Sequence, residues 1–216
     1  MQSFLLIISL FYVIGCSPKE VNSANIQTAS PSITESIAVQ GPDITIAKAK
    51  QMMETSKDES ILNKIKNVND FFNQITYMSD SIHWKKQDYW ATPFEFMGTG
   101  GGDCEDYAIA KYFTLLELGV KKESLYLAVV NVKASAGTHM VLLYVENKNS
   151  SPLVLDNLSF RVLPFSKRDD LTPVVAFNEL NAYEFTKDKF TQLVTIDWQN
   201  NNKWDRVLNR VYKLNE

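Results

Sequence analysis

The chain has 216 residues, of which 45% are hydrophobic and 12% aromatic, so it carries enough apolar surface for an ordinary globular core. Charged residues make up 22%, and 22 Lys and Arg against 25 Asp and Glu give a formal net charge of −3, which argues against a wholly disordered chain and against nucleic acid as a partner. Two Cys and two His leave almost no room for a zinc site built from both residue types.

Residues 1–16 resemble the leader of an exported protein. The apolar run over residues 4–14 has the length of a signal-peptide core and is too short to span a bilayer, although no Lys or Arg precedes it. The run ends at Gly15 and Cys16 in a pattern similar to a bacterial lipobox, in which the cysteine is acylated. This pattern predicts a periplasmic, membrane-tethered lipoprotein; the alternative is an ordinary signal peptide with an incidental Cys16.

Residues 17–42 are rich in Ser, Asn, Thr, Pro and Gln, a composition that cannot bury enough surface to fix the backbone. We therefore expect a flexible linker there, followed by one folded domain over residues 43–216. The first elements of that domain are two predicted helices, over residues 46–55 and 59–77, where apolar residues recur at three- and four-residue steps.

Pro93 and four glycines lie within residues 79–102, which predicts one long loop of the kind that usually has a function. A helix over residues 104–118 follows and ends before Gly119. Segments rich in Val, Leu and Tyr predict strands over residues 125–132, 139–146 and 153–157, with weaker strands at 161–163 and 182–185, before a partly helical end over 187–213. Helices followed by an antiparallel sheet predict an α+β domain.

Cys104 opens the helix that follows three consecutive glycines, and it is the candidate nucleophile. The partial positive charge and unpaired N–H groups of a helix N-terminus stabilise a thiolate and can also receive an oxyanion. The simpler alternatives are a buried apolar cysteine or a disulfide. Because Cys16 is expected to be lipidated or lost with the leader, we expect Cys104 to have no disulfide partner.

A nucleophilic cysteine needs a base, and the base needs an orienting group. His139 opens the predicted strand HMVLLYVE, and Asp156 lies near the end of the next strand, so adjacent strands could place the two side chains together. The other histidine, His83, lies in a polar segment and is expected to be a solvated loop residue.

Three carboxylates, Asp103, Glu105 and Asp106, surround Cys104 in sequence. A simple explanation is that these residues begin a helix, because Asp103 is a good N-cap and Asp106 can reach back to it. Like charges beside a thiolate nevertheless raise its pKa, so a cation is needed to offset them. Calcium, which prefers hard oxygen ligands, is the candidate cation.

Four blocks carry a family resemblance: YWATPFEFMGTGGGDCEDYAIAKYFTLLELGV, HMVLLY, PLVLDN and DDLTPVVAFN. Together they resemble the bacterial transglutaminase-like cysteine proteinases over roughly residues 60–185. The resemblance implies a papain-like, transglutaminase-type core and a Cys104–His139–Asp156 triad. It also implies calcium bound by Asp103, Glu105 and Asp106.

Members of that family cut the N-terminal region of large surface adhesins at a site with paired alanines, which releases the adhesin and disperses the biofilm. An inner-membrane receptor for cyclic di-GMP sequesters the protease. The resemblance therefore implies an adhesin substrate and such a receptor as partners of this chain, although the family is usually soluble, unlike a lipoprotein at Cys16.

Two other functions stay open on the sequence: a transglutaminase or amidase of the same fold, and a non-enzymatic calcium-stabilised binding module. For an enzyme, we expect the Cys104 N–H as one oxyanion donor. The second donor is expected from the stretch between Gln87 and Trp90, where simple packing of the aromatic rings is the alternative.

Overall fold

The computed structural model describes residues 6–9, 42–133, 135, 137–197 and 202–213. The predicted lipobox cysteine, Cys16, and residues 17–41 of the predicted linker lie outside the described residues. Leu6–Ser9, inside the predicted leader, forms strand β1.

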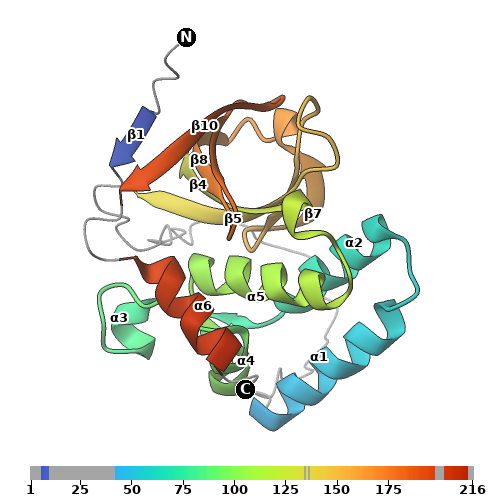
Figure 1. Cartoon of the computed structure of the whole chain (residues 1–216). Coiled ribbons are helices and arrows are strands. Elements are labelled where there is room, and N and C mark those ends of the chain that lie inside the picture. The colour runs from blue at the N-terminus through green and yellow to red at the C-terminus, as the bar shows by residue number, and fades with distance from the viewer. Residues whose placement is uncertain (1–5, 10–41, 134, 136, 198–201, 214–216) are drawn as a thin grey trace, which may run out of the picture.

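The domain has a curled sheet on one side and a group of helices on the other (Figure 1). The strand order is β1-β10-β9-β8-β4-β5-β6-β7, and all neighbours are antiparallel except β1 and β10, which are parallel. The strands after β1 are β4 (Leu125–Val132), β5 (Thr138–Tyr144), β6 (Leu153–Asp156), β7 (Ser159–Pro164), β8 (Leu171–Phe177), β9 (Ala182–Phe185) and β10 (Phe190–Asp197).

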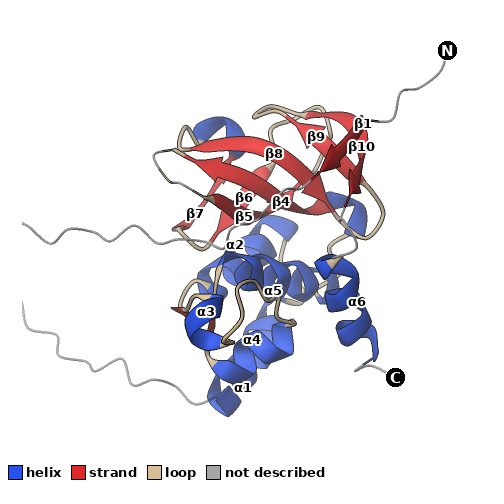
Figure 2. Cartoon of the chain, turned by 90° about the vertical axis from the view of Figure 1, so that its left-hand side faces the viewer, coloured by secondary structure: helices blue, strands red, loops and turns tan. Residues whose placement is uncertain are grey.

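Helix α5 (Cys104–Glu117) lies directly against the sheet, and the other helices are grouped around it (Figure 2). These are α1 (Pro42–Ser56), α2 (Ile61–Phe72), α3 (Asp80–His83), α4 (Pro93–Thr99) and α6 (Lys203–Lys213). A short parallel pair, β2 (Thr76–Tyr77) with β3 (Gly101–Gly102), lies just before α5, and two single turns of 3₁₀ helix occur at Lys122–Ser124 and Phe165–Lys167.

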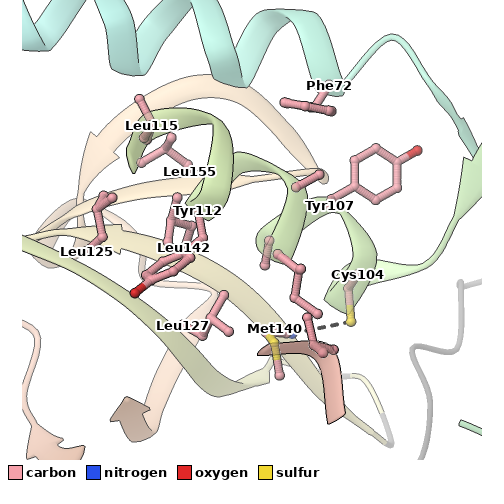
Figure 3. Packing of buried hydrophobic residues seen from close by; sticks show 14 of the residues in the cluster. Phe72, Cys104, Tyr107, Tyr112, Leu115, Leu125, Leu127, Met140, Leu142 and Leu155 are labelled. Atoms are coloured by element: carbon pink, nitrogen blue, oxygen red, sulfur yellow. Dashed lines mark hydrogen bonds between the residues drawn. The ribbon is translucent and has the colours of Figure 1, made fainter. Parts of the chain in front are cut away.

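Two apolar cores cover the two faces of the sheet. Tyr107, Tyr112 and Leu115 of α5 pack on Leu127 and Leu142 of the sheet (Figure 3). The alternate residues of the same strands form a second core inside the curl of the sheet, with Tyr126, Ala128, Val130, Val141 and Leu143 among them. Because both faces are buried, β4 and β5 read as continuous apolar runs, and α5 is held firmly against them.

The α+β prediction is confirmed, and the predicted strands over residues 125–132 and 182–185 match β4 and β9. The single long loop over residues 79–102 is wrong, because it contains α3, α4 and β3. The overlooked signal for α4 is a capping box: Thr92 and Glu95 bond each other's backbone N–H groups, and Pro93 follows the cap. Within the described part of the chain, every helix is too short or too polar to cross a bilayer.

Candidate active site

Cys104 is the first residue of α5 and is almost completely buried. The backbone N–H of Met140 in β5 donates to the Cys104 Sγ at 3.3 Å, which joins the start of α5 to the sheet (Figure 3). No cysteine among the described residues is free, and Cys104 is disulfide-bonded, so the expected lack of a disulfide partner is wrong for this structure. The nucleophile discussed below is the reduced thiol.

His139 and Asp156 meet as a buried pair. The His139 Nε2 lies 2.8 Å from the Asp156 Oδ1, because β5 and β6 are neighbouring strands in which Leu142 pairs with Leu155. His139 directly precedes Met140, whose N–H contacts the sulfur, so β5 places the backbone of His139 next to the start of α5. Two contacts therefore relate the three candidate residues: the side chains of His139 and Asp156 bond each other, and the residue after His139 bonds the Cys104 sulfur.

A cation, Arg168, holds the second oxygen of Asp156. The Arg168 Nη2 donates to the Asp156 Oδ2 at 2.7 Å, and the guanidinium is also bonded to Asp170. The Leu158 N–H donates to the Asp156 Oδ1 at 2.9 Å. Burial alone raises the pKa of Asp156, but its bonds and charge interactions with His139 and Arg168 hold that pKa well below its usual range. Asp156 is therefore an anion that can orient an imidazole and stabilise its charged form.

The sequence interpretation missed Arg168. Its position beside Asp169 and Asp170 has the pattern of a solvated charge cluster, and nothing in the sequence indicates that Arg168 alone turns inward. The structure leaves Asp169 exposed and buries the Arg168 guanidinium against the Asp156 carboxylate.

A second buried polar group consists of carboxylates that lie before and after Cys104 in sequence. Oxygens of Asp80, Asp103 and Asp106 all lie within 4.8 Å of one another, and all three residues are buried. Asp106 accepts from the N–H groups of Ala91 at 2.7 Å and Asp103 at 3.2 Å, so it caps the helix as predicted. Asp80 accepts from the Tyr89 N–H.

These carboxylates are electrostatically unsatisfied. The Oδ1 atoms of Asp80 and Asp103 are buried and have no hydrogen-bond partner among the described residues. Burial, together with the charges of the neighbouring acids, raises the pKa of Asp103 and Asp106, and burial raises that of Asp80 to about 6. Two orphaned anionic oxygens beside a third carboxylate are a donor set that suits a hard divalent cation.

The geometry differs from the predicted ligand set at two residues. Glu105 is not part of the clustered group; its Oε2 lies 3.0 Å from the Cys104 sulfur. Asp80 is part of it, although it lies 24 residues before Cys104 and gives no local spacing signal (104 − 80 = 24). It reaches the cluster because α3 folds back beside the start of α5.

The remaining candidates are His83 and the two residues considered as second oxyanion donors, Gln87 and Trp90. The His83 Nε2 bonds the Thr99 hydroxyl at 2.8 Å. Gln87 is exposed, whereas Trp90 is buried and stacks on Phe177 with ring centroids 6.3 Å apart. Either residue as the second oxyanion donor stays a prediction.

A cysteine at the start of a helix that packs on an antiparallel sheet, beside a His–Asp pair on neighbouring strands, defines a cysteine hydrolase of the papain-like and transglutaminase-like class. The model of the bacterial transglutaminase-like cysteine proteinases matches residues 34–171. The chain belongs to this family and is a cysteine protease.

Solved structures of LapG from Legionella pneumophila share the fold. The EGTA-treated form is 35% identical, with a TM-score of 0.68 over 79% of this chain and 90% of that chain. The calcium-bound form is 31% identical, with a TM-score of 0.64 over 80% of this chain and 99% of that chain. A comparison with curated proteins found no match.

Proposed function

We propose that the protein is a calcium-dependent cysteine endopeptidase that cleaves the N-terminal region of a large surface adhesin. The observation that carries the proposal is the buried bond between His139 and Asp156, next to the Met140 N–H that contacts the Cys104 sulfur. This arrangement supports the roles of Cys104 as nucleophile, His139 as base and Asp156 as orienting carboxylate.

In the proposed mechanism, the thiol of reduced Cys104 gives its proton to His139, and the sulfur attacks the carbonyl carbon of the scissile peptide bond. Because Nε2 is bonded to Asp156, Nδ1 is the ring nitrogen that exchanges this proton. The C–N bond then breaks, the leaving amine takes the proton from His139, and a thioester remains. Water attacks the thioester, His139 accepts its proton and returns it to the sulfur, and the new carboxylic acid leaves.

The start of α5 also offers the first oxyanion donor, the Cys104 backbone N–H. Its position at a helix N-terminus places a partial positive charge where negative charge develops in the tetrahedral intermediate. Asp156 stays ionised through the cycle because Arg168 and His139 both stabilise its charge.

Calcium is the cofactor that we propose for the carboxylate cluster. Asp80, Asp103 and Asp106 would hold it, since two of their buried oxygens lack any hydrogen-bond partner within the described residues. When bound, the ion would neutralise the negative charge beside the thiol. The calcium-bound and EGTA-treated forms of Legionella LapG support this choice of metal. Glu105 would take part only by leaving its place beside the sulfur.

The biological setting follows from the family resemblance. We propose that the substrate is cut at paired alanines, that the protein acts in the periplasm, and that in the reduced protein, which has no disulfide at Cys104, a lipid at Cys16 tethers it to a membrane. We also propose that an inner-membrane receptor for cyclic di-GMP sequesters it. The cleavage would then release the adhesin from the cell surface and disperse the biofilm.

The test is mass spectrometry of a recombinant N-terminal adhesin fragment with paired alanines, incubated with the reduced full chain and calcium. We expect two product masses that sum to the substrate plus one water, and no products with Cys104→Ala, whose melting temperature should stay close to that of the wild type. A crosslink or a mass-shifted glutamine would identify a transglutaminase or amidase instead. An unchanged fragment that co-purifies with the protein would identify a binding module.

A further inference from the structure

A buried lysine on α5, the helix that begins at Cys104, has no role in the proposed mechanism. Lys111 is completely buried on α5, seven residues after Cys104 (111 − 104 = 7). Seven residues are about two helical turns, so the two side chains lie on nearly the same face of α5. Burial lowers the pKa of Lys111 to about 7, although the charge of Asp156 opposes this shift. A lysine is rarely buried so deeply unless its partners require it.

The partners of Lys111 are two amides at the end of α2. Its Nζ donates to the Asn69 Oδ1 at 2.9 Å and to the Asn73 Oδ1 at 2.6 Å. Because an ammonium group has donors and no acceptor, both asparagines must turn their oxygens toward it. Their NH₂ groups therefore point away from Lys111.

Those NH₂ groups bond the turn that carries the triad carboxylate. Asn73 donates to the carbonyl oxygens of Asp156 at 2.7 Å and Ser159 at 3.0 Å. Asn69 donates to the carbonyls of Ser159 and Phe160, each at 3.3 Å. Asp156 and Ser159 pair across the tight turn between β6 and β7, so the two amides bond the backbone on both sides of it.

We propose that Lys111 is a positioning residue for the reaction. Through Asn69 and Asn73 it fixes the turn of Asp156, and with it the ring of His139, relative to the helix that carries Cys104. The single rigid element α5 thus holds the nucleophile at its start and the anchor of the orienting carboxylate two turns later. This inference rests on the proposed function, which assigns Asp156 to the triad.

The competing explanation is that Lys111 only joins α2 to α5. A matched control exists for that role, because the Lys64 Nζ of α2 bonds the Leu118 carbonyl at the end of α5 at 2.9 Å, far along the helix from the turn. Lys64→Met removes a lysine contact between the same two helices without touching the bonds to the Asp156 turn.

The first experiment measures kcat and KM of the full chain on the adhesin fragment. With Lys111→Met we expect kcat to fall about 10- to 100-fold while KM changes less than about twofold, because the reacting groups lose alignment rather than substrate contacts. With Lys64→Met we expect both values within about twofold of the wild type. In an Asp156→Asn background, Lys111→Met should cost less than about threefold, because its effect passes through Asp156.

Asn73→Asp separates positioning from helix packing. The carboxylate still accepts from Lys111 but cannot donate to the Asp156 carbonyl. Positioning predicts a loss of kcat comparable to that of Lys111→Met, whereas helix packing predicts a kcat close to the wild type. This variant also decides the matter if Lys111→Met fails to fold.

Wild-type kcat in Asn73→Asp would overturn the inference. An undiminished effect of Lys111→Met in the Asp156→Asn background would do the same. If Asp156→Asn alone kept full turnover, the triad itself would be refuted. Loss of activity in Asp156→Asn, with full activity in Lys111→Met and Asn73→Asp, would refute only the positioning role.

Discussion

Asp156 has each of its carboxylate oxygens bonded to a separate group, and this explains how one residue can orient a base. The Oδ1 accepts from Leu158 and pairs with His139, while the Oδ2 accepts from Arg168. With both oxygens fixed, the carboxylate cannot rotate, and the imidazole keeps one tautomer and one orientation.

Arg168→Met should weaken both the fold and the reaction. We expect the free energy of unfolding to fall by about 3 kcal/mol, because a buried carboxylate loses its cation, and kcat to fall by about tenfold. The control is Lys187→Met, whose ammonium bonds the Arg168 carbonyl and the exposed Asp169; there we expect less than about 1 kcal/mol. Equal stability of the two variants in chemical denaturation would contradict the prediction.

The same substitution should change the response to acid. The folded-state pKa of Asp156 is depressed, so its contribution to stability is present above the ordinary aspartate pKa of about 3.9 and is lost as the pH falls toward the folded value. Without Arg168 that depression is smaller, so less stability remains to be lost on acidification. Denaturation curves between about pH 7 and pH 3 should therefore converge for Arg168→Met and the wild type.

At the scale of elements, the start of α5 was predictable because its determinants are local. The glycines, the Asp103 cap, the returning Asp106 and Cys104 all lie within a few consecutive residues. His139 and Asp156 were predictable because they lie on consecutive strands, which pair in the sheet. Arg168 and Asp80 were not, because only the tertiary fold brings them to the site.

Among the strands that the sequence did not predict, β8 and β10 were missed for separate physical reasons. Strand β8 contains Pro173, which argues against a central strand, yet Pro173 lies opposite Val130 where the pairing register with β4 shifts and the ladder is irregular. Strand β10 lies near the edge of the sheet, and only Phe190 and Val194 of its residues are buried. The sequence therefore showed no clear strand pattern, and β10 was included in the partly helical segment predicted over residues 187–213.

Gly102→Ala should disrupt the start of α5 without altering any carboxylate. A Cβ at Gly102 would lie 2.2 Å from the Asp106 Oδ2 and 2.8 Å from the Phe96 ring, and Asp106 is held in place by its bonds to Ala91 and Asp103. We expect the calcium affinity to fall at least about tenfold and the free energy of unfolding to fall by about 1–3 kcal/mol. Isothermal titration with calcium and thermal melting measure the two effects.

The matched control for this substitution is Gly98→Ala. Gly98 lies in α4, and a Cβ there would meet nothing within 4 Å. Alanine in a helix should be neutral or stabilise the protein by up to about 1 kcal/mol, with unchanged calcium binding. A similar loss of calcium affinity in both variants would mean that the close approach of Gly102 to Asp106 has no special role.

On the scale of the whole molecule, the acidic cluster joins segments that are distant in sequence. Asp80 begins α3, whereas Asp103 and Asp106 belong to the start of α5, and Asp106 also bonds the Ala91 backbone before α4. A cation bound by these carboxylates would therefore hold α3 and the start of α5 together beside the nucleophile. Since an unfolded chain cannot assemble this donor set, binding should stabilise the whole fold.

Calcium should accordingly raise the melting temperature and restore activity after chelation. Magnesium is the control ion, because it demands a tighter octahedral site.

Asp80→Asn tests the cluster directly, and its effect on the melting temperature should differ between excess calcium and excess chelator. In excess calcium we expect a lower melting temperature and at least about tenfold weaker calcium binding than in the wild type, because one anionic ligand is lost.

In excess chelator we expect Asp80→Asn to be at least as stable as the wild type, because it removes one of three buried carboxyl groups whose burial and mutual repulsion disfavour their ionised forms. Helix capping alone predicts no such reversal, since Asp80 caps no part of α5 and its substitution should then lower stability equally with and without calcium. Thermal melts of both proteins, each in calcium and in chelator, separate the two explanations. Parallel losses under both conditions, with full activity in chelator, would leave the cluster as a helix start without a metal.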